Sequence, residues 1–352
     1  MSGLAPRRQV LIEGADVPQD LSDSIVSVSV EDHAVETDMV TLVVADPDMR
    51  WVDSPLLEPG KKVEIKMGYG QALKTVFVGR VARPEATFPQ DGAPSLSIRA
   101  YDLSQTFRRE EERKARTWQN TTDSQLARDI ASRHAFSPVD LDIETTTVVI
   151  PYVAQGNISD WEFLQKRAER IGFELFVELG KFHFHKPKDA GRVTVGALEY
   201  GRNLRSFEPR ISLDQQVTKV VVRGWDADKK APIIAMATSE TVASRAKQGT
   251  ITGADHVKTD FGAGVKVLQD LCPRSQKEAE DMAAAYFKRK EYEFISATGG
   301  CVGDPAFKAK ALVEISGVGR KYSGTYYLTK VVHMLDDGGY LCECEGQRNG
   351  LM

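Results

Sequence analysis

Between residues 9 and 104 the sequence is divided into short segments in which apolar and polar residues alternate. Turn-rich stretches separate five such segments, at 25–30, 40–44, 63–67, 76–81 and 96–100. Alternation with a period of two indicates a strand that buries one face, because successive side chains point to opposite sides. Short strands at this spacing are typical of an antiparallel barrel or sandwich. We therefore expect the first hundred residues to form an antiparallel β-domain.

Part of this β-pattern recurs near the other end of the chain. Residues 55–81 align without a gap with residues 305–331, and six of the 27 positions are identical. The identities include Val63-Glu64-Ile65, which align with Val313-Glu314-Ile315. Strands share valine and isoleucine by chance, because both residues favour β-structure. The continuous alignment of whole strand patterns favours the other explanation, two copies of one β-domain.

The segment 151–185 predicts a capped amphipathic helix followed by a β-hairpin. Ser159 and Glu162 have the S-x-x-E spacing of a capping box, and Gly172 stands where a left-handed cap is needed. Two more capping boxes, Thr122 with Gln125 and Ser275 with Glu278, predict helices on either side of this segment.

The exact residues of this segment point to one protein family more specifically than its hydrophobic periodicity does. The string PYVAQGNISDWEFLQKRAERIGFELFVELGKFHFH closely resembles the middle of the late control protein D family, the tail hub proteins of contractile phages. Related modules open type VI secretion spikes and occur in the hubs of phage-like injection particles. Segments 101–109, 117–131, 217–226 and 301–349 agree with the same family in the same order. The resemblance covers nearly the whole chain.

The fold class that follows is α+β and mainly β. We expect two tube-like antiparallel β-barrels, the second discontinuous, with a mixed α/β middle domain and a helical insert. The expected domains are 1–110 for the first barrel, 111–203 for the middle α+β domain, 204–226 with 291–352 for the second barrel, and 227–290 for the insert with its helix.

The resemblance implies a structural hub in the baseplate of a contractile tail or injection particle. Such a hub is a homotrimer that adapts a sixfold tail tube to a threefold spike and leaves a central channel for DNA or cargo. Its implied partners are a hexameric tail tube protein, a trimeric spike and other baseplate proteins. The chain ends at Met352, shortly after the second barrel, so the spike is expected to be a separate protein.

One loop supplies the candidate ring contacts. Arg50, Trp51 and Asp53 lie in the stretch DPDMRWVDS between two early strands. An exposed tryptophan is a common anchor of protein interfaces, so we expect these three residues to contact a neighbouring chain. The alternative interpretation is that the tryptophan caps the barrel.

Composition limits the other functions. The net charge of −4 argues against a nucleic-acid binder, which usually carries a basic face. No apolar run approaches the roughly 20 residues that span a bilayer, and no hydrophobic signal segment opens the sequence, so no membrane insertion is expected. We expect assembly in a bacterial cytoplasm and then a place in the tail or baseplate of a virion or injection particle.

No catalytic, cofactor or metal site is expected. His183 and His185 alternate on one strand like a pair of metal ligands, but no third ligand stands near them in the sequence, so we expect solvent-facing strand histidines. Asp140, Asp142 and Glu144 alternate in the same way, and a polar strand face is the simpler interpretation. Nucleotide-binding and hydrolase motifs are absent. The chain is thus expected not to be an enzyme; the alternatives to a hub are a tail-associated cell-wall hydrolase and a host-surface binding module.

Overall fold

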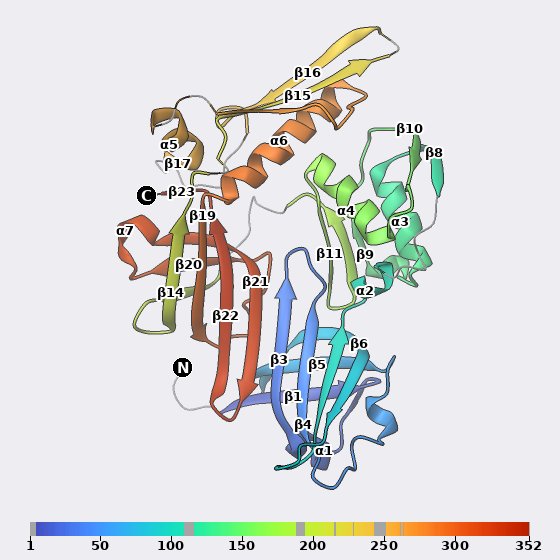
Figure 1. Cartoon of the computed structure of the whole chain (residues 1–352), viewed down its shortest axis with the longest axis vertical. Helices are drawn as coiled ribbons and strands as arrows, with labels where there is room; N and C mark the ends of the chain where they lie inside the picture. Colours follow the sequence, from blue (N-terminus) through green and yellow to red (C-terminus); the bar gives the residue numbers. More distant parts are fainter. Residues whose placement is uncertain are drawn as a thin grey trace.

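The computed structural model describes most of the chain in four regions (Figure 1). The described residues are 5–108, 116–187, 194–214, 216–227, 229–242, 251–260, 262 and 264–351. Strands dominate, and helices gather in the middle domain and the insert. The prediction of a mainly β, α+β fold is confirmed.

The first region, here the first unit, is an antiparallel group of six strands. They are β1 (Pro6–Ile12), β3 (Ile25–His33), β4 (Met39–Ala45), β5 (Lys62–Tyr69), β6 (Ala72–Thr87) and β7 (Ser95–Tyr101). They pair in the order β3-β4-β7-β6-β5-β1, and β2 (Ala15–Asp16) extends β1. Helix α1 (Gln19–Ser24) and the short 3-10 helix η1 (Pro55–Leu57) lie in the connections. All five alternating segments of the sequence form strands here.

The second unit is also built from six strands. They are β13 (Thr194–Glu199), β14 (Leu204–Ile211), β19 (Ile295–Val302), β20 (Leu312–Ser316), β21 (Gly324–Asp336) and β22 (Gly339–Arg348). The pairing order is β14-β19-β22-β21-β20-β13, and the short helix α7 (Gly319–Tyr322) joins β20 to β21. β13 pairs with β20 in parallel, although its residues were expected in the middle domain.

One continuous sheet and one core join the two units. β21 pairs with β3, so the strands of both units belong to a single 13-stranded sheet. Buried residues of both units, such as Val30 and Val331, belong to the same apolar cluster. Within the described ranges no ladder joins β1 to β3 or β13 to β14, so closure of each unit into a barrel stays a prediction.

The middle domain combines helices with two small sheets. Its elements are α2 (Ser104–Phe107), β8 (Thr117–Thr121), α3 (Asp123–Arg133), η3 (Pro138–Asp140), β9 (Leu141–Ile143), β10 (Ile150–Ala154), α4 (Asp160–Ile171), β11 (Glu174–Glu178) and β12 (Lys181–His185). β10 pairs with β8, and the other sheet has the order β11-β12-β9. An aromatic-rich core fills the domain.

The caps of these helices follow the sequence closely. Thr122 and Gln125 form a complete capping box at α3. At α4 the hydroxyl of Ser159 accepts from the backbone N–H of Glu162, but the Glu162 side chain pairs with Lys166 at 2.9 Å, so only half of the expected box forms. Gly172 ends α4 with a φ of 69°, in the left-handed conformation that glycine adopts cheaply.

The insert is more regular than its composition suggests. It contains β15 (Lys219–Asp226), β16 (Ala231–Ala237), β17 (Ile251–Thr252), α5 (Gly253–Asp260), β18 (Val265–Leu268) and α6 (Gln276–Tyr292). Its sheet has the order β16-β15-β18, and β17 pairs with β23 (Gly350–Leu351). The expected placement of 219–226 in the second barrel is wrong, because Val220 and Val222 on β15 are buried in a separate core with Phe287 of α6. None of the helices that the structure describes is long and apolar enough to cross a membrane.

Candidate assembly interface

The two units share one strand order, in which β3, β4, β7, β6 and β5 correspond to β14, β19, β22, β21 and β20. The ladders also share their irregularities. The β3–β4 and β14–β19 ladders are interrupted at the same place, between Ile25/Ser27 and between Leu204/Ser206. Bulges are specific features of a strand and not random defects. The internal repeat predicted from the sequence is therefore supported by strand order and by bulge position.

The gap-free alignment of the repeat is correct only for its first strand. Val63 pairs with Gly79 in the first unit, and Val313 pairs with Tyr326 in the second. Val63 and Val313 are 250 positions apart, whereas Gly79 and Tyr326 are 247 apart, so the second hairpin is three residues shorter. Bulges between Val81/Arg83 and Leu328/Lys330 give the same offset of 247 for β6 and β21.

The junction between the units is an antiparallel ladder between β21 and β3. It runs from Lys330 opposite His33 to Leu335 opposite Val28. Lys330 and Glu31 form an ion pair across it, with Nζ and Oε2 3.1 Å apart. The Lys310 ammonium donates to the His33 carbonyl oxygen at 2.7 Å. The junction thus combines a backbone ladder with cross-strand charge pairs.

Buried carboxyl groups lie beside this junction. Asp38 accepts from the backbone N–H of His33 at 2.9 Å, and Asp102 accepts from the N–H and the hydroxyl of Ser104 at 2.9 and 2.6 Å. Burial raises the pKa of Asp102 to about 6, against the effect of the Ser104 hydrogen bonds and of Lys310. Burial also raises the pKa of Asp38 well above its usual value, with Asp32 and Asp102 adding to the shift.

These shifts make stability depend on pH. A carboxyl group with a raised pKa binds its proton more tightly in the folded chain than in the unfolded chain. The unfolding free energy of the chain therefore falls as pH rises from about 4 to about 6. The Asp102→Asn variant keeps an oxygen acceptor for Ser104 and removes this pH-dependent fall of the unfolding free energy. We expect the variant to be more stable than the parent at about pH 7.5, by at most roughly 3 kcal/mol, and nearly equal at about pH 4. Urea unfolding at both pH values checks this; an equal difference at both would contradict it.

Among the described residues, each unit has an open strand edge at a position that corresponds to the junction. Arg80 on β6 pairs with Lys62 of β5 on one side and with Tyr101 of β7 on the other. The backbone of Val81 still bonds to Gly60 and Lys61, but beyond Val81 the β5 side of β6 has no pairing partner in the described part of the chain. The side of β14 that faces away from β19 is likewise unpaired among the described residues, past the bridge of Leu204 with Tyr200. Open edges are templates for pairing with another chain.

The open edge of β6 continues into an exposed aromatic residue. Phe88 follows the last residue of β6, and 60% of its surface is accessible. Its counterpart in the second unit is Leu335, which lies opposite Val28 of β3 and is 4% exposed. The first unit therefore exposes an apolar residue, Phe88, at the position where the second unit has a buried residue in its junction with β3.

In the loop that was predicted to contact a neighbouring chain, Trp51 is buried within its own unit. Trp51 is 6% exposed and belongs to the core of the first unit. Its backbone N–H donates to Asp46, and its indole N–H donates to the Ser24 hydroxyl at 3.2 Å. The expectation of an exposed Trp51 is thus wrong, because these bonds and its packing hold the residue in the core of the first unit. Arg50, stacked 4.6 Å over the ring, and Asp53 remain exposed, and their ring contacts stay a prediction.

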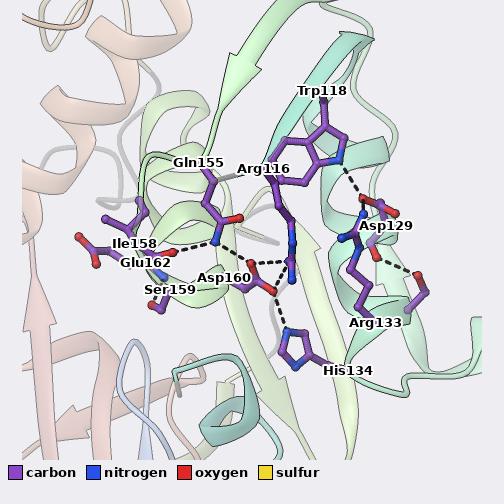
Figure 2. Close-up of polar contacts among 11 residues, drawn as sticks. Arg116, Trp118, Asp129, Arg133, His134, Gln155, Ile158, Ser159, Asp160 and Glu162 are labelled. Atoms are coloured by element: carbon purple, nitrogen blue, oxygen red, sulfur yellow. Dashed lines mark hydrogen bonds and ion pairs between the residues drawn. The ribbon is translucent and has the colours of Figure 1, made fainter. Parts of the chain in front are cut away.

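The middle domain contains a polar cluster that the sequence did not reveal (Figure 2). The carboxylate of Asp160 has no solvent exposure, and it accepts from Arg116 at 2.9 and 3.0 Å, Gln155 at 2.7 Å and His134 at 2.9 Å. Burial alone would raise the pKa of Asp160, but the bonds from His134, Arg116 and Gln155 lower it. A general acid in a hydrolase needs a raised pKa. The cluster therefore supports a structural role.

The other predicted polar strand residues lie together near the second unit. His183 and His185 on β12 face Asp142 of β9, with His183 Nδ1 3.1 Å from Asp142 Oδ2. Their side chains are 12% and 5% exposed, so the expectation of solvent-facing histidines is wrong. Glu144 accepts from the backbone N–H of Lys186, and Asp140 lies outside this group in η3.

Comparisons with known proteins identify relatives of the whole arrangement. The sequence model of a family described as the Alg8 N-terminal domain matches residues 4–337. The chain is 28% identical over 189 residues to the "Probable baseplate hub protein" of Escherichia phage P2, a match that covers 53% of this chain and 46% of that protein. The chain thus spans about half the length of the curated relative that it matches.

Solved structures share the fold at low sequence identity. A tail protein of Neisseria meningitidis superposes with a TM-score of 0.70 and 13% identity, over 99% of this chain and 98% of that one. A component of the type VI secretion system of E. coli superposes with a TM-score of 0.60 and 10% identity, over 96% of this chain and 76% of that one. The resemblance to tail and baseplate hub proteins is confirmed. These relatives are named for tail, baseplate or secretion-system parts and not as enzymes, in agreement with the prediction that the chain is not an enzyme.

Proposed function

The chain belongs to the Alg8 N-terminal domain family, and we propose that it is the trimeric hub of a contractile tail or injection-particle baseplate. In this proposal three chains, each with two similar units, form a ring of six units under a hexameric tail tube. The opposite face of the trimer keeps threefold symmetry and receives a separate spike. The ring encloses a channel for DNA or cargo, and assembly takes place in the cytoplasm of the producing cell.

The observation that carries the proposal is the β21–β3 junction, because it can be repeated between chains. β6 corresponds to β21, and β14 corresponds to β3. The open edge of β6 in one chain therefore matches the open edge of β14 in a neighbour. Head-to-tail contacts of this kind close into a ring when the rotation fits. Three chains would then contain three junctions within chains and three between them.

The register of the proposed contact follows from the bulges. Val332 lies opposite Glu31 within the chain, and the corresponding residues are Glu85 on β6 and Arg210 on β14. Opposite charges would thus face each other across the new ladder, an arrangement that stabilises strand pairs. The same register places the exposed Phe88 opposite Phe207 of the neighbouring copy, as Leu335 lies opposite Val28.

One proline weakens each of the two open edges. Ala34 donates to the Thr329 carbonyl at 2.9 Å, so alternate residues of β21, including Val331, direct their backbone groups toward β3. Pro84 takes the place of Val331 on β6, and Pro209 takes the place of Val30 on β14. Neither has an N–H to donate, and prolines on edges protect strands from unwanted pairing. We therefore expect the chain to form its ring only weakly until a tube or spike protein holds the copies together.

The native mass of the purified chain tests this proposal. Light scattering of the chain with its candidate spike and tube proteins should show a core of three copies, each of 38.9 kDa. The chain alone is expected to be in equilibrium between monomer and trimer, because the prolines remove two ladder donors. A stable dimer, or a monomer that ignores both partners, would contradict the hub and favour a host-surface binding module.

A further inference from the structure

Three potential metal ligands from two neighbouring strands converge in the middle domain. Asp142 on β9 pairs with His183 on β12, and His185 lies two residues further along β12 on the same face. One ligand atom from each of the three residues lies within 4.8 Å of the others. The parallel β9–β12 contact thus supplies the third ligand that the sequence around the two histidines lacks.

Hydrogen bonding alone does not satisfy His185. Its Nδ1 lies 2.7 Å from the carbonyl oxygen of Lys186, and a carbonyl only accepts, so Nδ1 carries the hydrogen. In the neutral ring, Nε2 then presents a lone pair to Oδ2 of Asp142 at 3.7 Å. Two acceptors cannot form a hydrogen bond with each other, so a cation placed between them would satisfy both.

The separations suit a metal ion. Oδ2 of Asp142 lies 3.1 Å from Nδ1 of His183 and 3.7 Å from Nε2 of His185. An ion about 2.0–2.2 Å from each atom, as zinc is from nitrogen and oxygen ligands, spans such distances near tetrahedral angles. The bond from His185 to the Lys186 carbonyl is also the outer contact that metal-bound histidines usually make, because it fixes the tautomer.

The surroundings leave room for a further ligand. A cavity of about 290 Å³ lies beside His183 and His185 and is lined on its other side by residues 308–312, which lead into β20 of the second unit. Its two ammonium groups already have carboxylate partners, Lys308 with Glu178 at 2.8 Å and Lys310 with Asp32 at 3.7 Å. An ion here would therefore meet a charge-balanced site.

We propose that Asp142, His183 and His185 bind a divalent transition-metal ion, zinc above all, with one coordination position open to this cavity. Nitrogen and carboxylate ligands with an open position suit zinc and the neighbouring first-row metals and do not suit magnesium or calcium. The ion would join β9 to β12, which pair through only three residue pairs. It would stiffen the part of the middle domain that contacts the second unit, whether or not the chain is a hub.

The test is a zinc titration of the full chain after removal of metal with a chelator. A Cys272→Ser background excludes the exposed thiol as a ligand. Calorimetry is expected to give one zinc per chain and a higher thermal midpoint in zinc, and neither effect with magnesium. His185→Ala and Asp142→Asn should lose both effects. His256→Ala is the matched control, because His256 also faces a carboxylate, Asp260, at 3.8 Å but outside the cluster.

Cobalt provides a readout that does not depend on stability. Four-coordinate cobalt with nitrogen and oxygen ligands absorbs visible light, so a folded chain with the site turns blue and the His185→Ala chain does not. Absence of zinc binding in the parent chain would show that the cluster is held by protein contacts alone and overturn the proposal. Unchanged binding in His185→Ala or Asp142→Asn would place the ion elsewhere and overturn it as well.

Discussion

Replacement of Asp160 by alanine is expected to lower the unfolding free energy of the middle domain by about 3–5 kcal/mol. The carboxylate is fully buried and binds Arg116, His134 and Gln155. Its removal takes the shared anion from a guanidinium and an imidazole with little exposure, and breaking a buried ion pair by removing one partner is costly. Urea unfolding followed by fluorescence measures the effect, because Trp118 and Trp161 belong to this core.

The matched control for this change is Asp129→Ala. Asp129 also binds an arginine and a ring N–H, with Arg133 at 2.7 Å and the indole of Trp118 at 2.8 Å, but its side chain is 40% exposed. Water can replace those contacts, so the expected loss is about 1 kcal/mol or less. Equal losses of unfolding free energy for the two variants would contradict the prediction, because they would show that burial of the Asp160 cluster does not add to its contribution to stability.

Cysteines at positions 85 and 210 are expected to link neighbouring copies covalently. The in-chain counterparts, Val332 and Glu31, form a non-hydrogen-bonded pair, because the adjacent Val331 directs its backbone groups to β3. In such pairs the Cα atoms are about 4.5 Å apart, within the range of a disulfide. Oxidation of the Glu85→Cys, Arg210→Cys chain, with Cys272→Ser, should give linked dimers and trimers. Nothing longer is expected, since a closed ring has no free end.

Two further variants control this experiment. Val332→Cys with Glu31→Cys places the same kind of pair inside one chain, so its disulfide should form without an increase in mass. Glu85→Cys with Glu208→Cys moves one partner by two residues and should give little linkage. Preferential linkage through position 208 would show that the register transferred from the in-chain junction is wrong.

Local features of the fold could be predicted from the sequence because they depend on neighbouring residues. The strands of the first unit and the caps at Thr122 and Gly172 follow from alternation and from side-chain hydrogen bonding. The repeat was visible as well, but only along β5. Beyond it, the shorter second hairpin removes three positions, and valine matches that look equivalent in the sequence are not equivalent in the ladders.

Features that depend on distant contacts could not be predicted. β15 has a valine-rich run like that of a barrel strand, yet it lies against α6, and nothing local distinguishes the two cores. Trp51 was placed outside because its bonds to Asp46 and Ser24 depend on how the loop folds back. Asp142 is 41 positions from His183, so only the pairing of β9 with β12 reveals the cluster.

End-on electron microscopy of the linked trimer tests the central claim most directly. If each chain contributes two equivalent units and β6 pairs with β14 of the next copy, the particle will show six similar lobes around an open centre. Three lobes without a channel, or open strings of chains, would contradict the account, because the two units would then not occupy equivalent places in one ring.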